Sequence, residues 1–242
     1  MKPIILIPAR MASTRLAGKP LADIHGRPMI VRVWQQAMAA GLGPVVVAAA
    51  EPEIIEAVEK AGGRAILTDP DLPSGSDRIF AALKAVDPGS IHDVVINLQG
   101  DLPALDPADI RAVAAALAGA DIATLAAEIT DPADRTNPSV VKPVVTWAAD
   151  GRTGRALYFT RAMAPTGDGP LFHHIGIYAY TRAALERFVT LPPSPLEKRE
   201  KLEQLRALEA GLSIRVARVD SVPISVDTPA DLEQARRLIP AT

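Results

Sequence analysis

Short runs of branched apolar residues alternate with amphipathic segments over the first half of the chain. Residues 4–7 (IILI) predict a strand that is buried on both faces, which is the pattern of a central parallel strand. Further strands are predicted at residues 45–48, 65–68 and 94–98, and helices at 28–40, 53–61, 79–86 and 107–117. Strands separated by helices indicate right-handed crossovers and a largely parallel sheet, in which ligands bind beyond the carboxyl ends of the strands.

The pattern changes after residue 131. Weakly alternating segments predict short strands at residues 140–147, 156–160 and 175–180, and Pro143 in the first of them suits an edge strand or a bulge. We expect an antiparallel insertion at about residues 131–191 within a single domain that spans residues 1–242. After the insertion come a helix over 194–210 that opens on a capping box, a strand at 214–219 and a helix that begins at Thr228.

Three cations follow the first predicted strand within ten residues. Arg10, Arg15 and Lys19 lie in a loop of small residues that contains a glycine. Such a loop can approach a polyphosphate closely, direct its backbone N–H groups inward and neutralise the negative charge. A solvated connector is the alternative, because most Arg and Lys side chains lie at protein surfaces. The loop is not a Walker loop, since Ser13 replaces its first glycine and Pro20 follows the lysine.

Two isolated carboxylates lie at predicted strand ends. Asp101 follows the strand at 94–98, and Asp227 follows a short apolar segment just before a helix. Magnesium prefers carboxylate oxygens and keeps substrate phosphates and waters as its other ligands, so the two residues together with the cationic loop predict a magnesium–triphosphate site. Each carboxylate alone also has a structural explanation, as a turn residue before Pro103 or as a helix cap.

Composition narrows the class of protein. The chain of 242 residues has a formal net charge of −2, which argues against nucleic acid as its main partner, and it has no cysteine for disulfides, thiolate chemistry or metal ligation. No apolar run approaches the roughly 20 residues that a membrane span needs, and no signal peptide precedes the first strand. A cytoplasmic enzyme with no membrane partner is expected.

Nine segments along the chain form motifs that can be compared with known families. They are IPARMASTRLAGKPL at 7–21, GRPMI at 26–30, SGSDRI at 74–79, NLQGDLP at 97–103, ALYFTRA at 156–162, HIGIYAY at 174–180, PSPLE at 193–197, LEQLR at 202–206 and VDTPADLE at 226–233. These motifs resemble those of the cytidylyltransferases that activate 3-deoxy-D-manno-octulosonate (Kdo), and the resemblance covers almost the whole chain. The first motif is shared with other sugar cytidylyltransferases, whereas HIGIYAY with PSPLE and LEQLR is far more specific and selects the Kdo branch.

The resemblance implies a fold, an activity and a nucleotide site. The fold would be an α/β three-layer sandwich of the nucleotide-diphospho-sugar transferase type, with a mainly parallel central sheet and an antiparallel insertion used for homodimerisation. The activity would be transfer of CMP from CTP to the anomeric hydroxyl of Kdo with release of pyrophosphate, the activation step for the lipopolysaccharide inner core. The implied site residues are Arg10, Arg15 and Lys19 with Ser13 for the triphosphate, Ala9, Arg10, Ser74 and Gly75 for cytosine, and Asp101 and Asp227 for Mg²⁺.

The resemblance also implies a pocket for the sugar acid. Arg161 would bind the substrate carboxylate, and Gln99 would lie at the boundary between sugar and nucleotide. The remaining implied members are His174, Tyr178, Glu203 and Gln204. Without the resemblance, His174 and Tyr178 would be read as packing or hydrogen-bonding residues of a strand, and Glu203 as a charge on a solvated helix face.

Three departures limit what the resemblance implies about the substrate. Ala49 and Ala50 replace a Thr-Asp pair that is common in the family, Leu102 replaces the glutamate of GDEP, and Pro143 interrupts a strand that is usually rich in valine. A cytidylyltransferase for 8-amino-Kdo or sialic acid therefore remains an alternative, and a non-catalytic nucleotide-binding dimer is a third hypothesis. The presence of Arg10, Arg15, Lys19, Asp101 and Asp227 together argues against the third.

Overall fold

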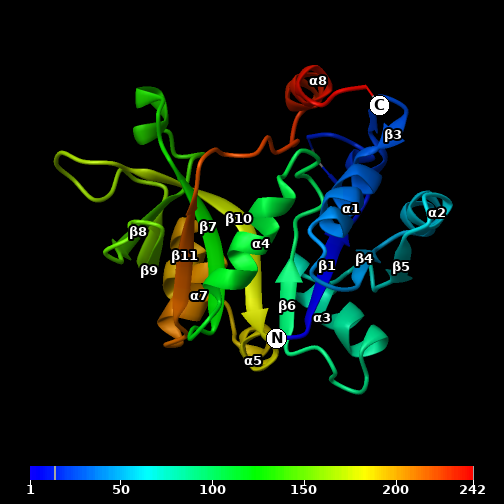
Figure 1. The fold of residues 1–242 in the computed structure, drawn as a ribbon, viewed down its shortest axis with the longest axis horizontal. Helices are drawn as coiled ribbons and strands as arrows, with labels where there is room; N and C mark the ends of the chain where they lie inside the picture. Colours follow the sequence, from blue (N-terminus) through cyan, green and yellow to red (C-terminus); the bar gives the residue numbers. More distant parts are fainter. Residues whose placement is uncertain (14, 242) are drawn as a thin grey trace. The chain divides into compact units, whose positions relative to one another are not determined.

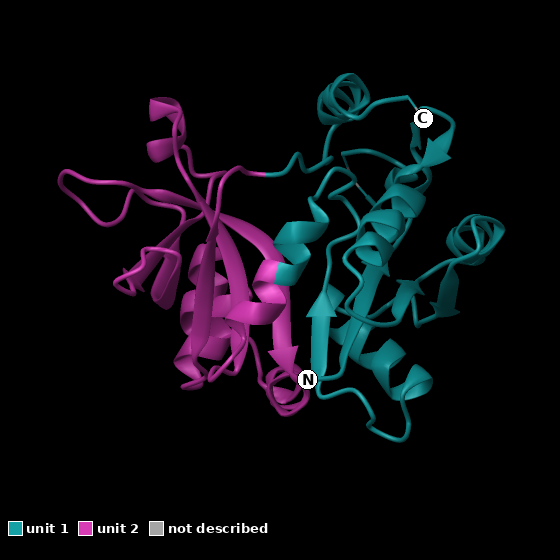
Figure 2. Ribbon diagram, in the orientation of Figure 1, with its two compact units in different colours: residues 1–111, 223–242 teal, residues 112–222 magenta. Residues whose placement is uncertain are grey.

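The computed structural model describes residues 1–13 and 15–241 and divides the chain into two compact units (Figure 2). Unit 1 contains Met1–Arg111 and Pro223–Thr242, and unit 2 contains Ala112–Val222. The insertion expected at 131–191 lies within unit 2, which begins earlier and ends later in the chain. Among the described residues, none of the helices combines the length and apolar character that crossing a bilayer requires.

Unit 1 is built on parallel strands, as the sequence predicts. Its strand order is β5-β4-β1-β6, and β1 pairs in parallel with both of its neighbours. Residues 4–7 are at most 2% exposed, because helices cover the strand and leave no polar face. The strands are β1 (Pro3–Ala9), β4 (Val45–Ala49), β5 (Arg64–Leu67) and β6 (Val94–Asn97), and a small hairpin consists of β2 (Asp23–Ile24) and β3 (Arg27–Pro28).

The strand order creates a switch point beside β1. The chain moves from β1 to β4 and β5, then returns to place β6 on the other side of β1 (Figure 1). Right-handed crossovers then put α3 on the opposite face from α1 and α2. Ligands of open α/β sheets bind at the carboxyl ends of the strands at such a point, here between β1 and β6. The helices of unit 1 are α1 (Met29–Ala39), α2 (Pro52–Lys60), α3 (Gly75–Val86) and α8 (Pro229–Leu238); α4 (Pro107–Ala116) crosses the boundary between the units.

The carboxyl-terminal segment returns to unit 1 and packs on its hairpin. Val226 and Leu232 join a buried cluster with Ile24 and Met29. Val226 N also donates to Asp101 O at 2.9 Å, which joins the segment to the loop after β6. Residues from the two ends of the sequence therefore lie at the same edge of the sheet.

Unit 2 is a mixed sheet in which one strand pair is parallel. Its order is β10-β7-β11-β9-β8; β7 and β11 are parallel, and the other pairs are antiparallel. With the parallel strands of unit 1, this confirms the predicted mixed α/β class with added antiparallel strands. The elements are β7 (Ile122–Glu128), β8 (Lys142–Trp147), β9 (Thr153–Thr160), β10 (Phe172–Thr181), β11 (Ile214–Val219), α5 (Arg182–Thr190), α6 (Pro195–Glu200) and α7 (Gln204–Glu209).

The sequence reading of unit 2 needs three corrections. It missed β7 and α5, and it predicted a single helix over 194–210 where the structure has α6 and α7. The break falls at Lys201, whose backbone is left-handed (φ 56°) and ends α6. The expectation for Pro143 is confirmed, because β8 is the edge strand and its register shifts between Val144 and Val145.

Candidate active site

A cavity of about 390 Å³ lies in unit 1 at the carboxyl ends of β1 and β6. It is bounded by the loop after β1, the start of α3, the loop after β6 and the residue before the cap of α8. The structure thus brings together every residue predicted for the nucleotide and the metal. These residues are Ala9, Arg10, Ser13, Arg15, Lys19, Ser74, Gly75, Gln99, Asp101 and Asp227.

The loop after β1 is held by contacts to its backbone. Met11 N donates to Glu51 Oε2 at 2.9 Å, and Gly18 takes a left-handed conformation (φ 66°) that lets the chain turn into the short 3₁₀ helix Lys19–Leu21. Pro20 fits the start of this helix because its missing N–H would have no partner there. These contacts position Arg10 and Arg15 in the loop, and the 3₁₀ helix positions Lys19.

Gly100 lets the loop after β6 approach β1. A Cβ atom at residue 100 would lie 2.9 Å from the carbonyl oxygen of Pro8 and 3.3 Å from Ile30 Cδ1. The first contact is to backbone, which cannot move aside like a flexible side chain. A glycine at residue 100 therefore lets the loop after β6 lie directly against β1, where both line the cavity.

We expect Gly100→Ala to lower the free energy of unfolding by about 1–3 kcal/mol, the usual cost of overpacking a well-packed site. Chemical denaturation measures the effect. Gly176→Ala is the control, because a Cβ atom at residue 176 meets no atom within 4 Å. Gly119→Ala is unsuitable as a control, because the positive φ at residue 119 would itself strain an alanine. A Gly100→Ala protein as stable as the wild type would show that β1 and the loop separate easily.

Lys19 bridges the two predicted metal ligands. Its Nζ donates to Asp101 Oδ2 at 2.8 Å and to Asp227 Oδ1 at 3.0 Å, and Arg15 lies 3.1 Å from the same Asp227 oxygen. Burial lowers the pKa of Lys19, but the two carboxylates outweigh burial and the net shift is upward. Lys19 is therefore held as a cation between two carboxylates that face the cavity.

The start of α8 fixes the position of Asp227. Thr228 and Asp231 form a capping box, and Asp231 Oδ2 also accepts a hydrogen bond from the Asp227 backbone N–H at 3.1 Å. The Asp227 carboxylate is therefore not the cap of this helix, because Thr228 and Asp231 serve as its caps. This excludes the structural explanation for Asp227 that the sequence left open.

The donor set fits a magnesium ion that shares its ligands with a nucleotide. Two carboxylates from separate loops supply oxygens, and Mg²⁺ is usually bound by one or two carboxylates together with substrate phosphates and waters. Within the described part of the chain, no three Asp, Glu, His or Cys side chains form a group that could hold a metal. Magnesium binding by Asp101 and Asp227 stays a prediction.

Helix α3 directs its amino terminus at the cavity. Ser74 caps the helix, because its Oγ accepts a hydrogen bond from Asp77 N at 3.2 Å. A Cβ atom added at Gly75 would lie 3.4 Å from a side-chain carbon of Pro8, so the start of the helix lies close to the end of β1. The first turn thus presents N–H groups to the cavity, which can bind a carbonyl or an anion.

Arg78 is a cavity residue that the sequence reading did not assign. It is 2% exposed, and its guanidinium donates to Thr68 Oγ1 at 2.6 Å and to the Asp69 and Pro70 carbonyls at 3.0 and 3.2 Å. Burial, and secondly Arg10, lowers the pKa of Arg78. It fixes the loop before α3 and adds positive charge to the cavity wall. The sequence did contain a signal for this role: Arg78 is a charged residue directly before the apolar face of the helix predicted at 79–86.

Unit 2 contains the residues implied for the sugar acid, apart from Gln99. The rings of His174 and Tyr178 lie 5.6 Å apart, centroid to centroid. Burial, then the negative charges of Tyr180 and Glu203, raises the pKa of the Tyr178 hydroxyl. Gln204 is buried, and its Nε2 has no hydrogen-bond partner among the described residues. A buried amide without a partner is costly and suits a position that binds a ligand.

Arg161 is held by main-chain carbonyls. Its Nε donates to Glu200 O at 2.9 Å, and its two terminal nitrogens donate to Pro138 O at 3.0 Å and Lys201 O at 3.5 Å. The Glu200 carboxylate accepts from Arg161 N at 3.0 Å and from Thr160 Oγ1 at 2.9 Å. The break between α6 and α7 therefore provides two of the three carbonyls that orient this guanidinium, and Pro138 provides the third.

The environment of His174 gives a pH-dependent contribution to stability. Burial, and secondly His173, lowers the pKa of His174 to about 3 from an ordinary value of 6.5. The unfolded chain then binds a proton that the folded chain does not, so stability is lost as the pH falls from 6.5 toward 3. We expect His174→Gln to reduce the slope of unfolding free energy between pH 6.5 and 5 by up to about 1.4 kcal/mol per pH unit. Urea denaturation at several pH values measures it, and equal slopes would contradict a neutral His174.

Comparison with known proteins agrees with this geometry. A family model described as cytidylyltransferase matches residues 4–214. The chain is 68% identical to the 3-deoxy-manno-octulosonate cytidylyltransferase of Parvibaculum lavamentivorans, and the match covers 97% of this chain and 91% of that protein. It is 64% identical to the enzyme of the same name from Rhodospirillum centenum, with 98% of this chain and 93% of that protein covered. It also matches a solved structure of CMP:2-keto-3-deoxy-manno-octonic acid synthetase complexed with CTP, with a TM-score of 0.91, 40% identity and 98% of each chain covered. The chain therefore belongs to the 3-deoxy-manno-octulosonate cytidylyltransferase family.

Proposed function

We propose that the protein transfers CMP from CTP to the anomeric hydroxyl of Kdo and releases pyrophosphate, which activates Kdo for the lipopolysaccharide inner core. The observation that carries the proposal is the cavity of unit 1, in which three cations and two carboxylates face one space. A metal–triphosphate needs both signs of charge in one site. The relatives named for this activity and the structural relative with CTP support the choice of reaction.

The loop after β1 would bind the triphosphate. Arg10 and Arg15 are exposed at the cavity and can reach phosphate oxygens, and Lys19 can exchange a carboxylate for a phosphate. Phosphoryl-group transfer depends mainly on positioning and charge neutralisation, so these cations would hold the α-phosphorus in place and stabilise the leaving pyrophosphate. The start of α3, at Ser74 and Gly75, would contact the cytosine.

Asp101 and Asp227 would hold Mg²⁺ in this reaction. A bound magnesium ion would neutralise phosphate charge and make the attacking hydroxyl more acidic. The role of the chain is to keep the two carboxylates in place: the hydrogen bond from Val226 N to Asp101 O joins their loops, and the capping box of α8 fixes the backbone of Asp227.

Residues of unit 2 would bind the sugar acid. The hydrogen bonds of Arg161 to described residues use three of its five guanidinium N–H groups. The other two N–H groups would bind the carboxylate of the sugar acid. A guanidinium already fixed by carbonyls loses little freedom when it binds a second acceptor. His174, Tyr178, Glu203 and Gln204 would contact hydroxyl groups of the sugar.

A coupled pyrophosphate-release assay with CTP and Mg²⁺ tests the reaction and its acceptor. Kdo, 8-amino-Kdo and sialic acid are offered separately at equal concentration, and ATP replaces CTP as a control. We expect release with CTP and Kdo at a kcat/KM that exceeds the values for the other acids and for ATP. Faster release with another acid would replace Kdo as the substrate, and no release with any acid would end the proposal.

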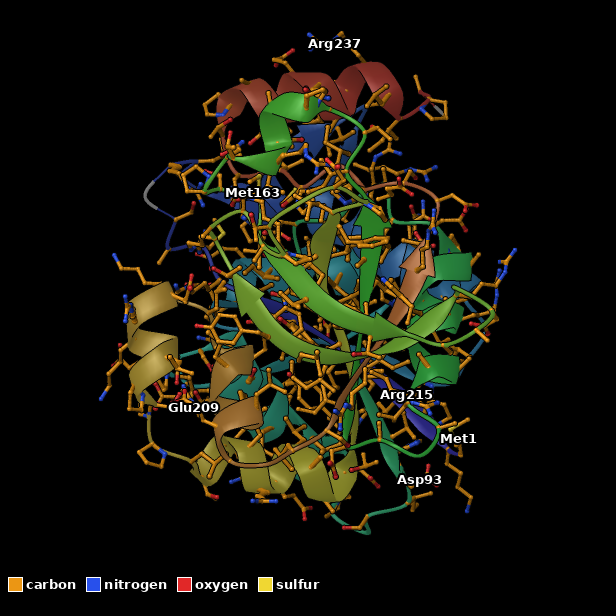
Figure 3. All side chains as sticks on the ribbon, turned by 90° about the vertical axis from the view of Figure 1, so that its left-hand side faces the viewer. Met1, Asp93, Met163, Glu209, Arg215 and Arg237 are labelled. Carbon is orange, nitrogen blue, oxygen red and sulfur yellow. The ribbon has the colours of Figure 1, made fainter. Side chains whose placement is uncertain are left out.

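A homodimer formed through unit 2 is part of the same proposal. Leu157 on β9 is 49% exposed. Met163, which follows β9 and is labelled in Figure 3, has an exposed fraction of 45%. Apolar side chains that lie together in an exposed patch favour a partner surface, and the proposal is that Leu157 and Met163 are covered by a second copy of the chain. Light scattering coupled to size-exclusion chromatography measures the mass in solution, and a monomer at micromolar concentration would contradict the dimer.

A further inference from the structure

The rings of His174 and Tyr178 are adjacent because β10 is bulged. The two residues are four positions apart, which is about 13 Å in a regular strand, yet the ring centroids are 5.6 Å apart. His174 pairs with Ala126 of β7 and Tyr178 pairs with Thr124, so five residues of β10 face three residues of β7. The register shift lies between Ile175 and Tyr178. The extra residues leave the plane of the sheet and bring the two rings together.

The side chain of Thr124 holds this bulge. Thr124 lies on β7 and is fully buried. Its Oγ1 lies 3.1 Å from Ile175 O and 2.8 Å from Ile177 O, the carbonyls on either side of Gly176. A bulge interrupts the hydrogen-bond ladder of a sheet, and a buried carbonyl that loses its ladder partner needs another donor. The threonine hydroxyl provides that donor from the neighbouring strand.

The same hydroxyl determines which nitrogen of His174 carries the proton. Thr124 Oγ1 is 2.9 Å from His174 Nε2. Because carbonyl oxygens only accept hydrogen bonds, the single hydroxyl hydrogen is directed at Ile175 O or Ile177 O, and the oxygen must accept from the ring. Nε2 is therefore the protonated nitrogen. The lowered pKa of His174 keeps the ring neutral at pH 7, so Nδ1 has a lone pair and can accept a hydrogen bond.

We propose that Thr124 is a positioning residue for sugar recognition, which fixes the bulge of β10 and the Nε2–H tautomer of His174 so that Nδ1 accepts a hydrogen bond from a hydroxyl group of the acid. The proposal rests on the proposed function, because that function makes His174 a sugar contact. It assigns His174 the role of an acceptor that selects a hydroxyl, and it makes a residue on the next strand responsible for that selectivity.

Kinetics with two substitutions at residue 124 test the role. Thr124→Val keeps the shape of the side chain and removes the hydroxyl, whereas Thr124→Ser keeps the hydroxyl. We expect Thr124→Val to raise the KM for Kdo about tenfold with the KM for CTP unchanged, as for the loss of one hydrogen bond. Thr124→Ser should behave like the wild type, and so should Thr146→Val, which changes an exposed threonine on β8. Equal effects of Val and Ser at residue 124, or equal increases in both KM values, would overturn the positioning role.

Nitrogen-15 NMR of the histidine rings in the free protein gives a second, substrate-independent readout. At pH 7 we expect His174 to show a protonated Nε2 and an unprotonated Nδ1 in the wild type and in Thr124→Ser, and a mixture of tautomers in Thr124→Val. A wild-type ring protonated at Nδ1 would overturn the inference. If no sugar acid is turned over, the proposed function fails, but the NMR spectrum still decides whether Thr124 sets the tautomer.

Discussion

Asp227→Ala is expected to lower kcat by roughly 10³-fold, the scale on which loss of one main electrostatic stabiliser acts on a transition state. Asp227 supplies one of two carboxylates in the cavity, and its oxygen is within 3.1 Å of both Lys19 and Arg15. Alanine would remove one of the two proposed metal ligands and release both cations from their shared contact. Pyrophosphate release at saturating CTP, Kdo and Mg²⁺ measures the effect.

The fold should tolerate this change. The Asp227 side chain is 37% exposed, and α8 is capped by Thr228 and Asp231 instead. We expect the free energy of unfolding to change by less than about 1 kcal/mol, as for exposed ion pairs. Asp220→Ala, at an exposed position of unit 2, is the matched control and should keep full activity. A fully active Asp227→Ala enzyme would remove Asp227 from the metal site.

Lys19→Met is expected to lower kcat/KM for CTP by about 10²–10³-fold, because the substituted side chain keeps the length of lysine and loses its charge. Lys19 is the most enclosed of the three loop cations and reaches both carboxylates. In the transition state it would instead neutralise phosphate. Steady-state kinetics with CTP as the varied substrate measure the loss, and Lys60→Met, at an exposed position of α2, is the control.

The same substitution should have the opposite effect on metal binding without nucleotide. In the free protein the ammonium group of Lys19 lies between Asp101 and Asp227, where it competes with a divalent cation for the same oxygens. Removing it leaves Asp101 without its ion pair to Lys19 and Asp227 paired with Arg15 alone, so the carboxylate pair is more negative. We therefore expect Lys19→Met to bind Mn²⁺ more tightly than the wild type in electron paramagnetic resonance titrations. Equal or weaker Mn²⁺ binding would contradict competition at the carboxylate pair.

The sequence predicted unit 1 well because its signals are local. Branched apolar runs such as residues 4–7 predict strands that are covered on both faces, and in the structure these residues are buried. Glycines and capping boxes delimit the helices. The predicted cations and carboxylates follow strand ends, and a parallel sheet gathers such ends at one edge. Asp101 and Lys19 could therefore be expected to lie close together before it was known that β1 pairs with β6.

Unit 2 was harder to predict because its geometry depends on contacts between strands. The alanines of β7 give no clear alternation, so neither this strand nor the role of Thr124 on it could be recognised. HIGIYAY shows four-residue spacing between His174 and Tyr178, and only the pairing with β7 shows that a bulge brings them together. The break at Lys201 depends on a left-handed backbone conformation, which glycine usually adopts. Because the residue is a lysine, nothing in the sequence indicated that the helix ends there.

Direct detection of the product tests the central claim most closely. Phosphorus-31 NMR and mass spectrometry of a reaction with CTP, Kdo and Mg²⁺ should show CMP–Kdo and pyrophosphate in equal amounts, and neither when Kdo is omitted. Release of free CMP and pyrophosphate without a sugar conjugate, or bound CTP that stays intact in the presence of Kdo, would contradict cytidylyl transfer by this protein.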